Sequence, residues 1–294
     1  MKLFQGTATA LVTPFRNEKI DYPAMGRLVE WQLKNGVDAL VVCGTTGEAS
    51  TLTGKERVQL THFVVDLVDG RVPVLAGTGS NNTRFTTELS KEMEAIGADG
   101  LLVVTPYYNK CTESGMITHY ETIADNVEIP MILYSVKSRT GVNITPQAVK
   151  ILKDHPRIVG IKEASGDISQ VCEMAQYIDD DFSIYSGNDD MAIPIMSLGG
   201  LGCISTVSNI IPKRYSDMLH AWMDGDVKQA AAEQIALKPL IDAVFAEVNP
   251  IPLKAALNIM GKCELEYRLP LCPPTNKTQY LLYDRLREYG LVSK

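Results

Sequence analysis

Lys162 is the residue of this sequence whose position best suits covalent chemistry. It ends the run IVGIK, residues 158–162, which is otherwise apolar and is typical of a buried strand. Because alternate side chains of a strand share a face, we expect Ile158, Gly160 and Lys162 on one face. If that face is buried, desolvation lowers the pKa of the lysine, and the neutral amine can attack a carbonyl to form a Schiff base. The alternative is a solvated lysine, or one paired with Glu163.

A glycine-flanked turn, GTTGE at residues 44–48, follows another apolar run. Its glycines allow the backbone N–H groups around Thr45 and Thr46 to converge on one point, and such an arrangement binds a carboxylate. The alternative interpretation is an ordinary tight turn capped by hydroxyl groups.

Phenols and an arginine lie at the ends of two further apolar runs. Tyr107 and Tyr108 come after residues 100–104, and Tyr134 ends the run 130–134. A phenol beside a hydroxyl can relay a proton, although its ordinary pKa of about 10 makes it a poor base alone. Arg139 follows shortly afterwards and can hold a carboxylate with two hydrogen bonds. The alternatives are core aromatic side chains and a solvated surface arginine.

The elements that must position these residues alternate between short apolar runs and amphipathic segments. Residues 53–68 and 82–96 place apolar side chains on one helical face, and Thr53 with Glu56 forms a capping-box pattern. The strand–helix unit recurs about eight times at roughly 30 residues per unit, which predicts an α/β fold, a (β/α)8 TIM barrel. An open doubly wound sheet is the alternative, but the GxGxxG fingerprint expected after its first strand is absent. The expected strands cover residues 7–13, 39–43, 72–76, 100–104, 130–134, 158–162, 182–185 and 202–206.

The chain is predicted to divide into a barrel and a helical extension. The barrel covers residues 1–224 and carries the active site at the carboxyl ends of its strands. Residues 225–294 are predicted to form a C-terminal helical subdomain, with proline-bounded helices over residues 227–247, 251–260 and 276–289.

Composition excludes several classes of protein. The 294 residues carry a formal net charge of −7, which argues against binding to nucleic acid or to an anionic membrane surface. No stretch approaches the ~18 consecutive apolar residues of a membrane helix, and the first residues lack the apolar core of a signal peptide, so we expect a cytoplasmic protein. The six cysteines and four histidines are spread singly, which argues against a disulfide scaffold and against a metal site.

Six motifs are specific when they are taken together. They are GTTGE (44–48), PYYNK (106–110), SRTG (138–141), IKEASGD (161–167), SGND (186–189) and NPIPLKAALN (249–258). This set resembles the dihydrodipicolinate synthase family, also called 4-hydroxy-tetrahydrodipicolinate synthases, from residue 6 to about residue 273. GTTGE alone indicates only the wider pyruvate-aldolase superfamily that includes N-acetylneuraminate lyase, whereas the SRTG, IKEASGD and NPIPLKAALN motifs favour the synthases.

The resemblance implies a lyase that condenses pyruvate with L-aspartate 4-semialdehyde in the diaminopimelate route of lysine biosynthesis. Pyruvate forms a Schiff base and then an enamine on Lys162, with no cofactor apart from this covalent adduct and no metal. The enamine attacks the aldehyde, and the amine of the semialdehyde closes the ring and releases the lysine. By the same resemblance the catalytic residues are Lys162, Tyr134, Thr45 and Tyr108, and the substrate-binding residues are Thr46, Arg139, Gly187 and Ile204.

The resemblance also implies a homo-oligomer. In the family, the tyrosine that matches Tyr108, or its neighbour Tyr107, reaches across a tight dimer interface, and two dimers often pair into a homotetramer. Two other functions stay open at this point. One is another Schiff-base pyruvate aldolase or dehydratase that acts on a sugar acid, like N-acetylneuraminate lyase. The other is a non-catalytic barrel kept for ligand binding, against which the intact set of catalytic residues argues.

One departure from the family pattern lies beside Arg139. The family usually reads Tyr-Asn-Val-Pro where this chain reads YSVK, residues 134–137. Loss of the proline frees the backbone and adds an N–H group and an amine at Lys137. We expect a looser loop and somewhat weaker binding of the semialdehyde.

A second departure concerns regulation by lysine. Members of the family that are inhibited by lysine carry histidines and a glutamate around a pocket at the dimer interface. The matching positions here are Gly54, Arg57 and Phe85, while Asn81 and Tyr107 remain. Because the acidic partner for the amine of lysine is lost, we expect little feedback inhibition.

Overall fold

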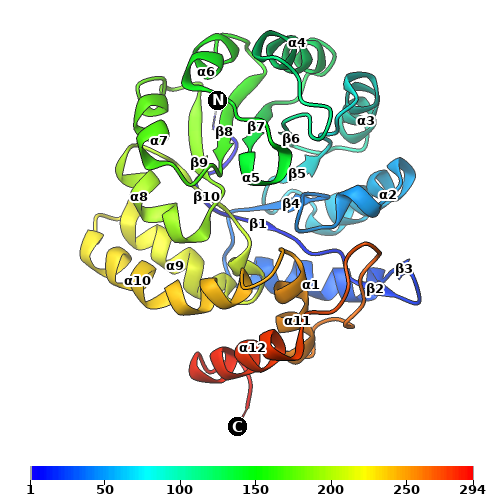
Figure 1. Cartoon of the computed structure of the whole chain (residues 1–294), viewed down its shortest axis with the longest axis vertical. Coiled ribbons are helices and arrows are strands. Elements are labelled where there is room, and N and C mark those ends of the chain that lie inside the picture. Colours follow the sequence, from blue (N-terminus) through cyan, green and yellow to red (C-terminus); the bar gives the residue numbers. More distant parts are fainter. Residues whose placement is uncertain (1, 294) are drawn as a thin grey trace.

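A closed ring of eight parallel strands organises the protein (Figure 1). The computed structural model describes residues 2–293, and in it β1 pairs with both β10 and β4, so that the ring has no open edge. The predicted (β/α)8 barrel is therefore confirmed. Its strands are β1 (Gly6–Ala10), β4 (Ala39–Val42), β5 (Val74–Gly77), β6 (Gly100–Val104), β7 (Met131–Ser135), β8 (Ile158–Glu163), β9 (Ser183–Ser186) and β10 (Gly202–Ser205). A small antiparallel hairpin, β2 (Phe15–Arg16) and β3 (Lys19–Ile20), lies outside the ring.

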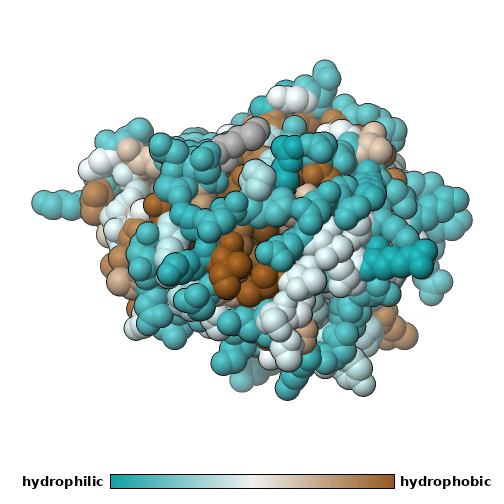
Figure 2. Space-filling view, turned by 90° about the horizontal axis from the view of Figure 1, so that it is seen from above, coloured by the Kyte–Doolittle hydropathy of each residue, from teal (hydrophilic) through white to brown (hydrophobic). Residues whose placement is uncertain are grey.

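Helices follow the strands of the ring and surround it (Figure 1). Figure 2 shows that hydrophilic side chains cover most of one outer face, with a hydrophobic cluster near its centre. The helices of the barrel are α1 (Tyr22–Lys34), α2 (Gly54–Val68), α3 (Thr83–Ala95), α4 (Glu113–Ala124), α5 (Lys137–Thr140), α6 (Pro146–Leu152), α7 (Ile168–Ala175), α8 (Ala192–Ser197) and α9 (Pro212–Met223). Three short 3-10 helices are η1 (Ala49–Thr51), η2 (Asp189–Met191) and η3 (Val207–Asn209).

Local signals set the helix ends as the sequence predicts. Thr53 caps α2 by accepting a hydrogen bond from the backbone N–H of Glu56, whose carboxylate accepts one from the backbone N–H of Thr53. The side chain of Asn82 caps α3 by accepting a hydrogen bond from the N–H of Phe85, without a return bond. These bonds satisfy N–H groups that have no partner within the helix.

A β-bulge in β8 corrects the predicted strand alternation. Met131 pairs with Ile158, but the next residue of β7, Ile132, pairs with Gly160, so Val159 is the extra residue. As a result Val159 packs inside the ring, and Ile158 packs against the surrounding helices. The expectation that Ile158 shares a face with Lys162 is wrong, because a bulge shifts the alternation of side chains by one residue.

The C-terminal residues form three further helices, α10 (Val227–Val244), α11 (Ile251–Ile259) and α12 (Asn276–Glu288). The helix predicted over residues 227–247 ends at Val244, and the other two end one residue earlier than predicted. Leu237, Leu253 and Leu282 of these helices share one hydrophobic cluster with side chains of α8 and α9. The extension therefore packs firmly on the barrel. Among residues 2–293, no helix combines the length and the apolar character needed to cross a membrane.

Candidate active site

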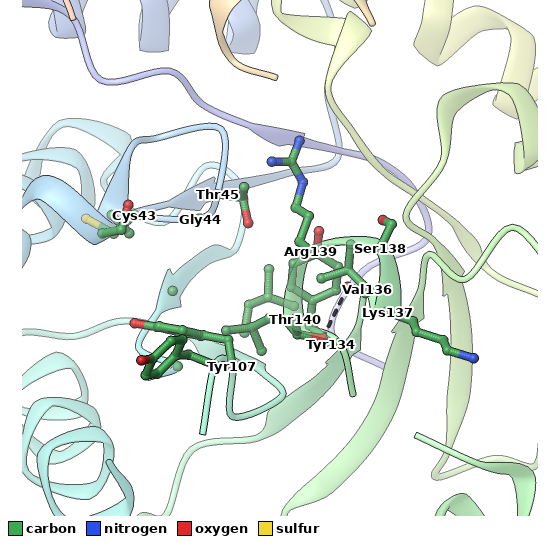
Figure 3. A pocket seen from close by; sticks show the side chains of 18 of the residues that line it. Cys43, Gly44, Thr45, Tyr107, Tyr134, Val136, Lys137, Ser138, Arg139 and Thr140 are labelled. Atoms are coloured by element: carbon green, nitrogen blue, oxygen red, sulfur yellow. Dashed lines mark hydrogen bonds between the residues drawn. The ribbon is translucent and has the colours of Figure 1, made fainter. Parts of the chain in front are cut away.

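Two connected cavities open at the carboxyl ends of the strands. The inner cavity, of about 170 Å³, is bordered by residues that end or follow β4, β7, β8, β9 and β10. The outer cavity, of about 680 Å³, shares Thr45, Tyr134 and Arg139 with the inner one, and Figure 3 shows side chains that line it. The sequence predicts the active site at this end of the barrel, and the main polar candidates are found there.

Lys162 ends inside the inner cavity with only 5% of its surface exposed. Strand pairing places it opposite Tyr134 of β7, and its Nζ lies 4.4 Å from the centroid of the Tyr134 ring. Among the residues that the structure describes, none makes a hydrogen bond or an ion pair with this nitrogen, whose neighbour is the Tyr134 ring. A buried amine that is free of partners is available to attack a carbonyl carbon.

The two alternatives considered for Lys162 do not hold. The side chain is buried, so it is not solvated. The carboxylate of Glu163 accepts hydrogen bonds from the backbone N–H of Ser165 at 2.6 Å and from Nε2 of Gln170 at 3.4 Å. Burial raises the pKa of this carboxyl above its ordinary value. Glu163 thus belongs to a separate network and leaves Lys162 unpaired.

Gly187 gives the lysine room. A Cβ atom at this position would lie 2.7 Å from Cβ of Ala164, which is too close, and 3.0 Å from Cε of Lys162, which would have to move slightly. Gly187 therefore lines the inner cavity as the resemblance implies. Ile204 is fully buried in the cluster inside the ring and does not border the inner cavity, whereas Thr206 does.

The turn at residues 44–48 is held in a tight form. The N–H of Gly47 donates to Gly44 O and that of Glu48 to Thr45 O, both at 3.1 Å, and the Thr13 hydroxyl donates to Gly47 O at 2.7 Å. Thr45 and Thr46 both border the inner cavity. The turn therefore presents its two hydroxyl-bearing residues to the space beside Lys162.

Arg139 lies on a hydrogen-bonded helical turn, α5. The N–H of Arg139 donates to Val136 O, and the N–H of Gly141 donates to Lys137 O, each at 2.9 Å. The expectation that this segment is looser than in relatives with proline stays a prediction. Figure 3 shows the Arg139 side chain extending toward the side of the cavity that carries Thr45, while Lys137 points away from it.

The two neighbouring tyrosines border only the outer cavity. Tyr108 is 89% exposed and has a φ of 72°, an uncommon value for a residue other than glycine. Of the three predicted relay residues, the chain thus brings Thr45 and Tyr134 to Lys162 and leaves Tyr108 on the surface.

Sequence reasoning assigned no role to Asn249, which the structure places in the site. Its Nδ2 donates to the Thr46 hydroxyl at 2.9 Å, and its backbone oxygen accepts from Nη2 of Arg139 at 3.2 Å. Its side-chain oxygen is buried without a hydrogen-bond partner, and the residue borders the inner cavity. The NPIPLKAALN motif contains this residue, but nothing in the sequence connects it to Thr46.

The charge around the outer cavity is positive, although the chain carries a net charge of −7. Its lining includes Arg57, Lys110 and Arg139, and also Lys137, whose amine points away from the cavity; in the described part of the chain it includes no acidic side chain. A cleft with one sign of charge concentrates ions of the opposite sign. The opening therefore favours small anions such as carboxylates. Within residues 2–293, no group of three or more potential metal ligands is found.

The fold and the site together define a (β/α)8-barrel enzyme with a buried lysine in its active-site cavity. Residues 3–288 match the dihydrodipicolinate synthetase family. The chain is 49% identical over 295 residues to the 4-hydroxy-tetrahydrodipicolinate synthase of Thermoanaerobacter sp. (strain X514), with 100% of this chain and 99% of that protein covered. The chain belongs to the dihydrodipicolinate synthetase family.

Solved structures agree with this assignment. The crystal structure of dihydrodipicolinate synthase from Thermotoga maritima superposes with a TM-score of 0.97 at 44% identity, covering 99% of this chain and 100% of that one. A dihydrodipicolinate synthase variant described as the first monomeric one matches equally well, with a TM-score of 0.97 at 44% identity over 99% of this chain and 98% of that one. These relatives favour the synthase over the sugar-acid aldolase that the sequence left open.

Proposed function

We propose that the protein is a 4-hydroxy-tetrahydrodipicolinate synthase, which condenses pyruvate with L-aspartate 4-semialdehyde in the diaminopimelate route of lysine biosynthesis. The observation that carries this proposal is the buried, unpaired amine of Lys162 in a cavity that also contains Thr45, Tyr134 and Arg139. The full-length relatives named as this synthase support it.

The first half of the reaction takes place on the lysine. Nζ of Lys162 adds to the C2 carbonyl of pyruvate, water leaves, and an imine forms. Loss of a C3 proton then gives the enamine. The backbone N–H groups around Thr45 and Thr46 bind the pyruvate carboxylate, and we assign the carbonyl of Gly187 and the side chain of Ile204 to the lining of the pyruvate pocket. No cofactor is needed, because the covalent adduct itself stabilises the carbanion.

The second half forms the ring. C3 of the enamine bonds to the aldehyde carbon, whose oxygen takes up a proton and becomes a hydroxyl. The amine of the semialdehyde then adds to the imine carbon, and Nζ leaves as the free amine. Arg139 binds the carboxylate of the semialdehyde, since a guanidinium offers two parallel donors. Thr45 and Tyr134 move the protons, together with Tyr108.

The exposure of Tyr108 suggests how the third relay residue reaches the site. In a homodimer, Tyr108 of each subunit enters the outer cavity of its partner, which completes the relay. Two such dimers form a homotetramer. We place the enzyme in the cytoplasm, where all six cysteines, which are free thiols in the structure, would stay reduced.

Borohydride trapping tests the proposal directly. We expect reduction in the presence of pyruvate to add one pyruvate-derived group to the protein, and peptide mass mapping to locate it on Lys162. Lys162→Ala, the matched control, should give no adduct. A coupled assay with both substrates should yield the heterocyclic product, and N-acetylneuraminate should not be cleaved. An adduct on another residue, or none, would refute the mechanism.

A further inference from the structure

An ion pair lies fully buried behind the site, outside the groups that the mechanism uses. Glu48 ends the GTTGE turn, and Lys254 lies on α11; the two residues are 206 positions apart. Their charged groups are in direct contact, and neither side chain has any exposed surface. Nζ of Lys254 also donates to Glu266 O at 2.8 Å and lies 4.2 Å from the centroid of the Phe15 ring.

Stability alone does not account for this pair. Moving two charges out of water is costly, and replacing a buried ion pair with apolar residues of similar size is often neutral or stabilising. Removing only one partner is strongly destabilising, because it leaves a buried charge without compensation. The pair is therefore better explained by the geometry that it imposes on the segment to which it is attached.

That segment has an uncommon backbone shape. Glu48 has φ 55° and ψ 35°, in the left-handed region that residues with a Cβ atom rarely adopt. Such conformations persist where surrounding contacts fix them, and they cluster at active sites. The N–H of Glu48 donates to Thr45 O, and Glu48 O accepts from the N–H of Thr51. A displacement of Glu48 is thus transmitted to Thr45.

The same C-terminal segment holds the turn at a second point. Asn249, just before α11, donates to the Thr46 hydroxyl, and Lys254 within α11 binds Glu48. The backbone N–H of Arg268 completes the contacts of the Glu48 carboxylate at 3.3 Å. The start of α11 therefore acts as a rigid support for both halves of the turn.

We propose that Glu48 and Lys254 are positioning residues, whose buried contact holds the Thr45–Thr46 turn in its reactive orientation toward Lys162. This inference rests on the proposed function. Neither residue borders the inner or the outer cavity, so both act through the turn and not on a substrate. Small displacements of positioned groups can lower rates by about 100-fold, and that sets the expected scale.

The decisive variant is the double substitution Glu48→Gln/Lys254→Met, which removes both charges and nearly preserves volume. We expect a folded protein with a thermal midpoint close to that of the wild type, a kcat lowered roughly 10- to 100-fold, and a raised KM for pyruvate. The matched control is Glu30→Gln/Arg71→Met, which removes an ion pair whose hydrogen bonds involve neither the turn nor α11. The control should keep kcat within about two-fold of the wild type.

Two conservative single variants test the same inference if the double variant does not fold. Lys254→Arg retains the charge with a different reach, and Glu48→Asp shortens the carboxylate arm by one methylene. Each is expected to fold and to lower kcat less than the double variant does. Wild-type kcat and KM in the folded double variant, or in both conservative variants, would overturn the inference. An inactive wild type without a pyruvate adduct would instead refute the proposed function, so the two failures are distinguishable.

Discussion

The amine of Lys162 lies 4.4 Å from the centroid of the Tyr134 ring, and the two residues face each other across neighbouring strands. The Tyr134 ring covers one side of the nitrogen, while the hydroxyl of the same side chain can transfer a proton. Substitution can separate the contribution of the ring to the burial of the amine from that of the hydroxyl to proton transfer.

Tyr134→Phe keeps the ring and removes only the hydroxyl. We expect the pyruvate adduct on Lys162 to form and kcat to fall by roughly 10² to 10⁴, which is the usual contribution of a positioned proton-transfer group. Steady-state kinetics and borohydride trapping check both parts. Tyr134→Leu, which also removes the ring, should trap less adduct. An unchanged kcat in Tyr134→Phe would exclude the hydroxyl from the relay.

Lys137 takes the first position of α5, where the family usually has proline. The N–H of a first helical residue has no partner within the helix, and proline suits this position. Lys137→Pro should therefore reduce the number of backbone conformations that the segment can adopt when it is not in the α5 turn. We expect the KM for the semialdehyde to fall by a few-fold, with kcat nearly unchanged. Equal KM values for the two proteins would refute the expected weakening.

Lysine should inhibit this enzyme poorly. Nε and Nη2 of Arg57 both donate hydrogen bonds to the backbone oxygen of Ala49. The described lining residues of the outer cavity include no carboxylate that could bind an ammonium group. Phe85 packs beside Gly54, where a Cβ atom would lie 3.5 Å from the ring. Initial rates should stay near the uninhibited value at lysine concentrations below about 1 mM, because a weakly bound ligand occupies few sites at such concentrations. Half-inhibition at sub-millimolar lysine would contradict this expectation.

Activity should depend on assembly, because Tyr108 is exposed in the single chain. Dilution that dissociates the oligomer should lower specific activity in parallel with the loss of dimer in sedimentation velocity. Tyr108→Phe should lower kcat without changing the sedimentation profile. Full activity in a proven monomer would show that the chain needs no partner for its relay.

Acid should weaken the contact between the C-terminal segment and α2. Hydrogen bonds from Arg268 lower the pKa of Glu56 from 4.5 to about 2. A carboxyl with a lowered pKa stabilises the folded state above its unfolded pKa and loses that effect as pH falls through its folded pKa. The free energy of unfolding of the wild type should therefore exceed that of Glu56→Gln by about 1 kcal/mol at neutral pH, since the pair is only partly buried. The difference should disappear between about pH 4.5 and pH 2 in denaturant titrations, and a constant difference would contradict the assignment.

Much of the barrel follows from local patterns in the sequence. Parallel strands covered on both faces are continuously apolar, so their ends are visible, and a lysine at such an end is conspicuous. The capping box of Thr53 and Glu56 is equally local. These signals located the mouth of the barrel, and with it Lys162, Thr45 and Arg139.

What the sequence does not reveal depends on contacts between distant segments. The bulge at Val159 arises from how β7 and β8 pair, and no residue type marks it. Asn249 meets Thr46, and Lys254 meets Glu48, across more than 200 positions of the chain. For Ile204 the structure gives a place inside the ring, and the role at the pyruvate pocket that the resemblance implies stays a prediction.

The ring closes between its first and last strands, and this has a consequence for biosynthesis. On the ribosome β1 emerges well before β10, so it stays without one of its neighbours until residues 202–205 have been made. Lys254 is synthesised after β10, so the carboxylate of Glu48 remains hydrated until then. Folding that depends on contacts so distant in the chain is slow. The nascent protein therefore cannot complete the buried contact behind the Thr45–Thr46 turn until α11 has been synthesised.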